Sequence, residues 1–223
     1  MRRCWLFQRR LRQPVLSLDS SEWHRPIRIW RRLGTGVSAD GSVIVGNIPG
    51  PRAFRWTAAT GRVDLGNLSG AKFSEAHAVS ADGSVVIGES GGHAFRWTEA
   101  TGMIDLGVDG AAFAESADGS IVIGGYDNSR SGTNAFCWSE STGARLLSDV
   151  LHDDYGLDMS GWYLNQALAI SPNGRFIVGR GTTSSGPGVW MADFEVPEPP
   201  SPMLAGLTSV CLLAPASCRN RNW

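Results

Sequence analysis

The string "VSADGSVIVG" at Val37–Gly46 decides the fold, because it recurs three more times along the chain. The copies read "VSADGSVVIG", "ESADGSIVIG" and, in degraded form, "ISPNGRFIVG", and they occupy residues 79–88, 115–124 and 170–179. A second string follows each copy: "AFRWT", "AFRWT", "AFCWS" and "GVWMA" at 53–57, 94–98, 135–139 and 188–192. Its first three tryptophans, Trp56, Trp97 and Trp138, are spaced 41 residues apart. The chain therefore contains about four repeats of one structural unit.

One repeat unit reads as four short strands, with Ala76–Ser80 as the first. Asp82-Gly83 follows, and Asp-Gly between apolar runs predicts a hairpin because glycine adopts the positive φ that the turn needs. The second strand, "SVVIG" at 84–88, is apolar on both faces, so we expect neighbours on both sides. His93–Thr98 and Met103–Leu106 are the third and fourth strands. This pattern is typical of a β-propeller blade; a parallel β-helix, whose coils are usually shorter, is the alternative.

The predicted fold class is all-β: a propeller-like array of about four four-stranded antiparallel blades. The fourth unit supplies only three strands, at 167–171, 175–179 and 189–194. Its missing strand is predicted to be Arg28–Gly34, which would close a ring, while an incomplete ring is the other interpretation. Apolar residues at helical spacing also predict one short helix in the insertion at 144–154, on Leu146, Leu147, Val150 and Leu151.

Charge and composition divide the chain into three segments. Residues 1–27 form a basic arm, 28–194 the repeat domain, and 195–223 a Pro-rich linker with a hydrophobic tail. Nine arginines against two acidic residues give residues 1–32 a charge of +7, whereas nine basic and eighteen acidic residues give 33–195 a charge of −9. An acidic body argues against nucleic-acid binding. The arm has no recognisable signal peptide, which predicts either a mis-assigned start or the disordered arm of a cytosolic protein.

The segment "GGHAFRWTEATGMIDLG" from Gly91 resembles the HAF repeat of predicted extracellular bacterial proteins. The tail resembles the PEP-CTERM sorting signal, with a motif at Val196, Pro197, Glu198 and Pro199 before an apolar stretch. These resemblances imply export to the surface of a Gram-negative-type bacterium, processing by an exosortase-type enzyme, transient membrane contact and no catalytic activity. A disordered Pro-rich end is the alternative interpretation of the tail.

Few residues in the sequence suggest catalytic chemistry. Asp40, Asp82 and Asp118 occupy equivalent turn positions, which predicts a structural role, and Cys137 is expected to be a small buried residue. We expect no cofactor and no metal site. The predicted function is a non-enzymatic exported scaffold or binding module, with extracellular polysaccharide or surface proteins as candidate partners. The alternative is a propeller-type glycan-active enzyme that uses acidic residues of the 149–158 insertion as general acid and base.

Overall fold

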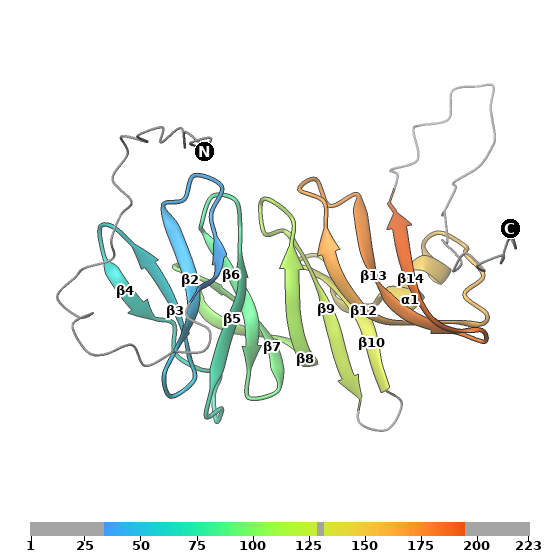
Figure 1. The fold of residues 1–223 in the computed structure, drawn as a ribbon, viewed down its shortest axis with the longest axis horizontal. Helices are drawn as coiled ribbons and strands as arrows, with labels where there is room; N and C mark the ends of the chain where they lie inside the picture. The colour runs from blue at the N-terminus through green and yellow to red at the C-terminus, as the bar shows by residue number, and fades with distance from the viewer. Residues whose placement is uncertain (1–33, 129–131, 195–223) are drawn as a thin grey trace, which may run out of the picture. The chain divides into compact units, whose positions relative to one another are not determined.

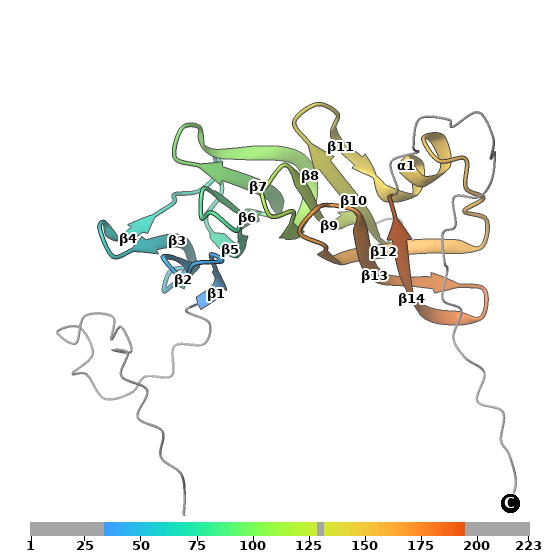
Figure 2. The same ribbon diagram turned by 90° about the horizontal axis from the view of Figure 1, so that it is seen from above.

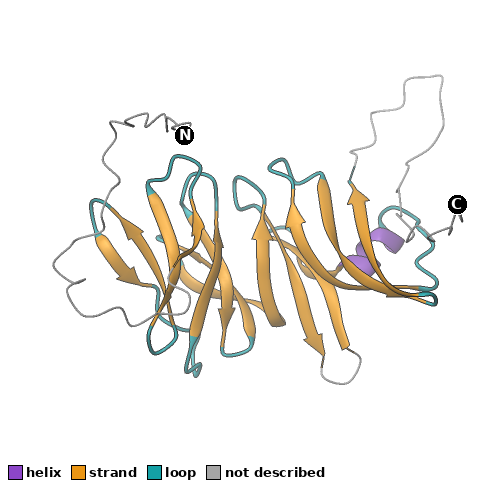
Figure 3. Cartoon of the chain, in the orientation of Figure 1, coloured by secondary structure: helices purple, strands orange, loops and turns teal. Residues whose placement is uncertain are grey.

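The computed structural model describes residues 34–128 and 132–194, which form fourteen strands and one short helix. The strands make three antiparallel sheets (Figure 1). Strands and turns account for nearly all of the described chain, as the cartoon coloured by secondary structure also shows (Figure 3). The prediction of an all-β repeat array is therefore confirmed.

The first unit is a complete four-stranded meander. Its strands lie side by side in chain order and are β1 (Gly34–Val37), β2 (Val43–Ile48), β3 (Arg52–Thr57) and β4 (Gly61–Asp64). Gly34 thus opens the first unit, whereas the rest of the predicted ring-closing strand, 28–33, lies outside the described residues.

The second and third units share one sheet of seven strands. The second unit contains β5 (Ser74–Val79), β6 (Val85–Ser90), β7 (His93–Thr98) and the first half of β8 (Gly102–Glu115). The third unit contains the second half of β8, then β9 (Ile121–Asn128), β10 (Gly132–Ser139) and β11 (Gly143–Leu146).

Strand β8 corrects the expectation of separate blades, because its fourteen residues pair with β7 of one unit and with β9 of the next. The spacing of the repeat explains the difference. Asp40 and Asp82 are 42 residues apart, but Asp82 and Asp118 are only 36 apart. No residues remain for a loop between the second and third units, so the strand runs straight on.

The fourth unit has three strands, as predicted, although they are longer than expected. They are β12 (Trp162–Ile170), β13 (Phe176–Thr183) and β14 (Gly186–Asp193). The predicted helix of the insertion is confirmed as α1 (Leu147–Asp153), whose buried residues are Leu147, Val150 and Leu151. Helix α1 packs against β10, β11 and β12 (Figure 2).

Each unit has the same turn between its first two strands, and its aspartate is a structural residue as predicted. In the second unit, the Asp82 carboxylate accepts hydrogen bonds from Ser80 Oγ (2.6 Å), Ser84 N (2.9 Å) and Ser84 Oγ (2.8 Å). These bonds, led by that of Ser80, hold the pKa of Asp82 below its ordinary value. Gly83 follows with a φ of 75°. The same three bonds recur at Asp40 and Asp118. The side-chain oxygen of Asn173 accepts the equivalents of the first two, from Ser171 Oγ and the amide of Arg175.

The turns also join each unit to the next. The amide of Ala39 donates to the carbonyl oxygen of Ala81, that of Ala81 to Ala117, and that of Ala117 to Pro172, each at 2.9 Å. Apolar clusters fill the three junctions between consecutive units. A repeat buries its apolar face only against its neighbour, which predicts that the phenylalanines and tryptophans of the repeated third strand are buried. The prediction is confirmed for the phenylalanines, Phe54, Phe95 and Phe136. It is wrong for the tryptophans, Trp56, Trp97 and Trp138, which are only half-buried.

Candidate functional site

An arginine of one unit and a tryptophan of the next are in contact at each of the first two junctions, although a cavity of about 390 Å³ remains beside Arg55 and Arg96. Arg55 of the first unit donates from Nε to the carbonyl oxygen of Gly83 (3.1 Å), and its guanidinium carbon lies 6.0 Å from the centre of the Trp97 ring. Arg96 of the second unit repeats both contacts one unit later, with Gly119 (3.3 Å) and Trp138 (5.6 Å). Each arginine is thereby held in place by the next unit through a cation–π contact and a hydrogen bond.

The third junction lacks this pair. Cys137 stands where Arg55 and Arg96 stand in the earlier units, and Ala192 stands where the next unit would carry its tryptophan. Two long side chains are thus replaced by two short ones. A cavity of about 600 Å³ lies here, lined by Ile121, Cys137, Trp138, Ser139, Thr142, Val150, Tyr155, Asn173, Gly174, Arg175, Ile177 and Phe194. We call it the third-junction groove.

Aromatic rings and one ion pair shape the third-junction groove. The rings of Tyr155 and Phe194 meet edge to face, with centres 5.3 Å apart. Arg175 binds Asp193 through two bonds, Nε to Oδ1 at 2.6 Å and Nη2 to Oδ2 at 3.0 Å. Trp138 also lines the groove, although its ring is the one that contacts Arg96 at the second junction. Apolar rings beside a few fixed polar groups are typical of a site that binds a small molecule or one residue of a polymer.

The thiol and the phenol that line this groove are held in their neutral forms. Burial raises the pKa of the Cys137 thiol to about 11, so the thiolate that nucleophilic chemistry needs is scarce at neutral pH. Burial, together with the charge of Asp154, raises the pKa of Tyr155 as well. The expectation that Cys137 is a small buried residue is confirmed in part, because its side chain is half-buried and lines the groove.

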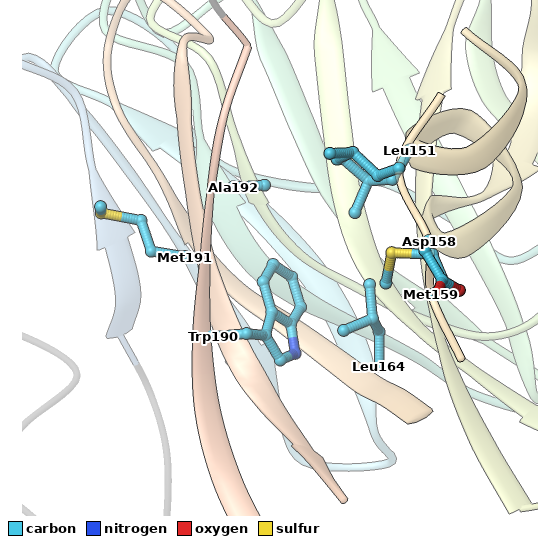
Figure 4. Close-up of a pocket in the computed structure, with 8 residues that line it drawn as sticks. Leu151, Asp158, Met159, Leu164, Trp190, Met191 and Ala192 are labelled. Carbon is cyan, nitrogen blue, oxygen red and sulfur yellow. The ribbon is translucent and has the colours of Figure 1, made fainter. Parts of the chain in front are cut away.

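A second, smaller cavity of about 70 Å³ lies between the insertion and β14. Figure 4 shows Trp190 on the same side of β14 as Leu151 and Leu164, whereas Met191 points to the other side. The indole N–H of Trp190 is buried and has no hydrogen-bond partner among the described residues. Trp190 occupies the position of Phe54, Phe95 and Phe136, so the N–H is an addition peculiar to the fourth unit.

The acidic residues of the insertion are bound to other groups. Arg145 contacts Asp154 at 2.6 Å and Asp153 at 3.5 Å. Asp158 accepts from the amide of Ser160 at 2.8 Å, which lowers the pKa of its carboxyl group. Asp153 and Asp154 are thus paired with a guanidinium group, and the pKa of Asp158 is lowered, whereas a general acid needs a raised one.

Sequence reasoning missed Glu115, the one acidic side chain of the described residues whose pKa is strongly raised. Both its carboxylate oxygens are buried without a hydrogen-bond partner, and burial raises its pKa to about 8 despite the nearby charge of Arg96. The other units place Val37, Val79 and Ile170 at this position. A glutamate among aliphatic residues in the alignment of the repeats was the signal that could have identified it.

The sorting motif Val196–Pro199 lies outside the described residues, as do the basic arm and the apolar tail. Within 34–128 and 132–194, no group of three or more His, Cys, Asp or Glu side chains is arranged to hold a metal ion. The helix in this part of the chain does not have the length and apolar character needed to cross a membrane.

No protein-family model matches this sequence, and no match was found among curated proteins. Among solved structures, a TolB protein from Agrobacterium tumefaciens matches at a TM-score of 0.50 and 15% identity, over 73% of this chain and 58% of that one. The computationally designed Ika4 protein matches at 0.40 and 21%, over 72% and 91%. An oligogalacturonate lyase in complex with manganese matches at 0.37 and 12%, over 72% and 61%.

The match to the TolB protein bears on the fold alone. This chain spans 58% of the length of that protein. Together with the repeated meanders and their turn-to-turn bonds, the match identifies the described residues as a β-propeller-like array of four blades, the last with three strands.

Proposed function

We propose that the protein is a non-enzymatic binding or scaffold module, exported to the surface or extracellular matrix of a Gram-negative-type bacterium. The observation that carries this proposal is the third-junction groove. It is the larger of the cavities between units, and the arginine and tryptophan that meet at the other junctions are replaced there by Cys137 and Ala192. A repeat that departs from its own pattern at one junction, and leaves aromatic rings there, is suited to hold a ligand.

Extracellular polysaccharide is the ligand class that we propose for the groove. Sugar rings carry apolar C–H faces and hydroxyl groups, and the groove offers the rings of Tyr155 and Phe194 beside the hydroxyl groups of Ser139 and Thr142. Surface proteins are the other candidate partners. The net charge of −9 over residues 33–195 argues against nucleic acid as a ligand.

The alternative function, a glycan-active enzyme, has less support. It requires a pair of carboxyl groups in a cleft, one of them with a raised pKa. Asp153 and Asp154 are paired with Arg145, and Asp158 is held ionised by the amide of Ser160. Glu115 has a raised pKa, but its carboxylate oxygens are buried.

Refilling the groove tests the binding proposal. Cys137→Arg restores the residue of the first two units and should abolish binding, whereas the control Cys137→Ser keeps the groove open and should retain binding. The measurement is binding of the protein to a panel of bacterial exopolysaccharides, with Arg55→Ser as a second control, because Arg55 contacts Gly83 and Trp97 at the first junction, outside the groove. Equal binding by Cys137→Arg and the unchanged protein would exclude this groove as the site.

Delivery is tested separately, through the proposed sorting motif. In a host with a working exosortase, a version of the protein with a functional signal peptide should lose the residues after the motif during export. Intact mass of the exported protein measures this loss. Retention of residues 200–223, or no effect of replacing Pro197, Glu198 and Pro199 with alanine, would contradict the proposed sorting role.

A further inference from the structure

The two ends of the array carry complementary unpaired faces. We call the face of a unit that packs on the following unit its front, and the opposite face its back. Val45, Ile87 and Ile123 lie on the fronts of the first three units and are fully buried, at 0% exposure. The equivalent residue of the fourth unit, Val178, is 39% exposed. The front of the fourth unit therefore keeps the apolar character of a junction without a unit to cover it.

A neighbouring position on this front is also exposed in the fourth unit and buried in the other three. Ala53, Ala94 and Ala135 are buried in the first three units, whereas Val189 at the same position is 63% exposed. Repeat proteins whose arrays end in solvent usually have a polar outer face on the terminal repeat. Val189 is larger and more apolar than the alanines of the first three units, which favours contact with a further unit.

The back of the first unit is the matching face. Val86, Val122 and Ile177 lie on the backs of the later units and are buried, but Ile44 at this position is only partly buried. The turn glycines show the same difference. Gly83, Gly119 and Gly174 are each in close contact with a side chain of the preceding unit, from Val43, Val85 and Ile121. Gly41 of the first unit has open space around it.

We propose that a second copy of this chain supplies the missing partner, so that the front of the fourth unit packs on the back of the first unit of the other copy. Phe176, which occupies the position of Val43 and Val85, would then cover Gly41 of the partner. This goes beyond the proposed function, because it assigns an assembly to the repeat domain whatever the domain binds.

The proposal specifies a closed dimer. A head-to-tail contact generates either a ring or an open filament. Two copies with four units each make eight units, which lies within the range of four to eight blades that propellers usually have, whereas three copies would exceed it. The junction between copies differs from the three junctions within the chain, because Pro172 has no amide hydrogen to donate to the next turn. The junction between copies therefore depends on apolar contact.

The molar mass of the full chain in solution, measured by light scattering over a concentration series, tests the assembly. The expected mass is twice the chain mass of 23.9 kDa. Val178→Arg and Ile44→Arg should each reduce it to that of one chain, with the circular-dichroism spectrum unchanged. Val63→Arg is the matched control, because Val63 is similarly exposed, at 43%, but lies on β4, away from both end faces.

Mixing the two variants distinguishes the proposed contact from a symmetric one. Val178→Arg keeps an intact back and Ile44→Arg an intact front, so the mixture can form one unchanged junction, which neither variant can form alone. The mixture should therefore associate more strongly than either variant, but less than the unchanged protein, because its second junction carries both arginines. A dimer that persists in Ile44→Arg would indicate front-to-front packing and overturn the proposal. A single-chain mass for the unchanged protein would overturn it too, because the front would then be bare or covered by a segment of the same chain.

Discussion

Individual residues in this protein are best understood by comparison with their equivalents in the other units. Where the units agree, as at the turn aspartates, the residue maintains the fold. Where one unit differs, the structure around it changes: Cys137 opens a groove, Glu115 buries a carboxyl group, and Pro172 removes a donor. Three of the departures thus have a definite physical consequence.

Glu115 should make the stability of the protein depend on pH. Its pKa is raised from 4.5 to about 8 in the folded chain. Between these values the unfolded chain releases the proton while the folded chain retains it, so the free energy of unfolding falls as pH rises. Glu115→Gln has no carboxyl group to titrate, so its free energy of unfolding does not fall in this way as pH rises. We expect the variant to be more stable than the unchanged protein by about 2 kcal/mol at pH 8.

Denaturant unfolding at pH 4 and pH 8 measures this effect. At pH 4 the difference between Glu115→Gln and the unchanged protein should be much smaller than at pH 8, because the glutamate is then protonated in the folded chain and largely so in the unfolded chain. The variant Glu89→Gln, of an acidic residue on β6, serves as the control for loss of a carboxyl group. An equal effect of Glu115→Gln at both pH values would exclude the titration of this residue as the cause.

The fold should tolerate phenylalanine in place of Trp190, because the other units carry phenylalanine at this position. The buried N–H of Trp190 has no partner among the described residues, and an unsatisfied buried donor costs about 1–3 kcal/mol. Trp190→Phe removes that cost but leaves space, since the cavity beside it grows. We therefore expect a change in the free energy of unfolding within about 1 kcal/mol of zero, far less than the ~3–5 kcal/mol that Trp190→Ala should cost. Thermal and denaturant unfolding of both variants measure the difference.

The glycines at the ends of strands affect stability in two ways, through their own backbone conformation and, at some positions, through contact with the preceding unit. Gly83 has a φ of 75°, and a side chain there would collide with Val43. Gly102 has a similar φ of 65° but open space around it. Gly102→Val should cost about 1–2 kcal/mol from backbone strain alone.

Gly83→Val should cost more than Gly102→Val, by about 1–3 kcal/mol, because it adds the collision to the strain. The difference between their free energies of unfolding isolates the contact between units, since both glycines lie in turns of the second unit. If the two variants lose the same stability, the first and second units do not pack as described.

How much of this could be predicted from sequence differs between local and long-range features. The Asp-Gly turns, the buried strand at 84–88 and the helix within 144–154 were predicted because each depends on neighbours in sequence. The continuous strand β8 differs from the two separate strands that the repeat pattern predicts. The shorter spacing between Asp82 and Asp118 is its signal in the sequence, because it leaves no residues for a loop. The third-junction groove depends on Cys137 and Ala192 together, 55 residues apart, and single-residue reasoning does not pair them.

At the scale of the whole molecule, the bonds between turns give the array a direction. Each unit donates an amide hydrogen to the next, and the series ends at Pro172. Pro172→Ala would supply the missing donor at the front of the fourth unit. If this front packs on the first unit of a second copy, each of the two junctions of the closed dimer gains one bond. Dimerisation should then tighten by about 25-fold, the equivalent of roughly 2 kcal/mol. Sedimentation equilibrium of the two proteins measures it, and unchanged or weaker association would contradict this arrangement of the junction.

Consecutive units stack through hydrogen bonds between their turns, and amide hydrogen exchange measures whether these bonds are present. Ala39, Ala81 and Ala117 lie in surface turns, where amides ordinarily exchange within the fastest class. Here each donates to a carbonyl oxygen of the next unit at 2.9 Å. If the units stack in this way, all three amides exchange at least about a hundredfold more slowly than unprotected amides. Exchange of these three amides at the unprotected rate, with the strand amides still protected, would contradict it.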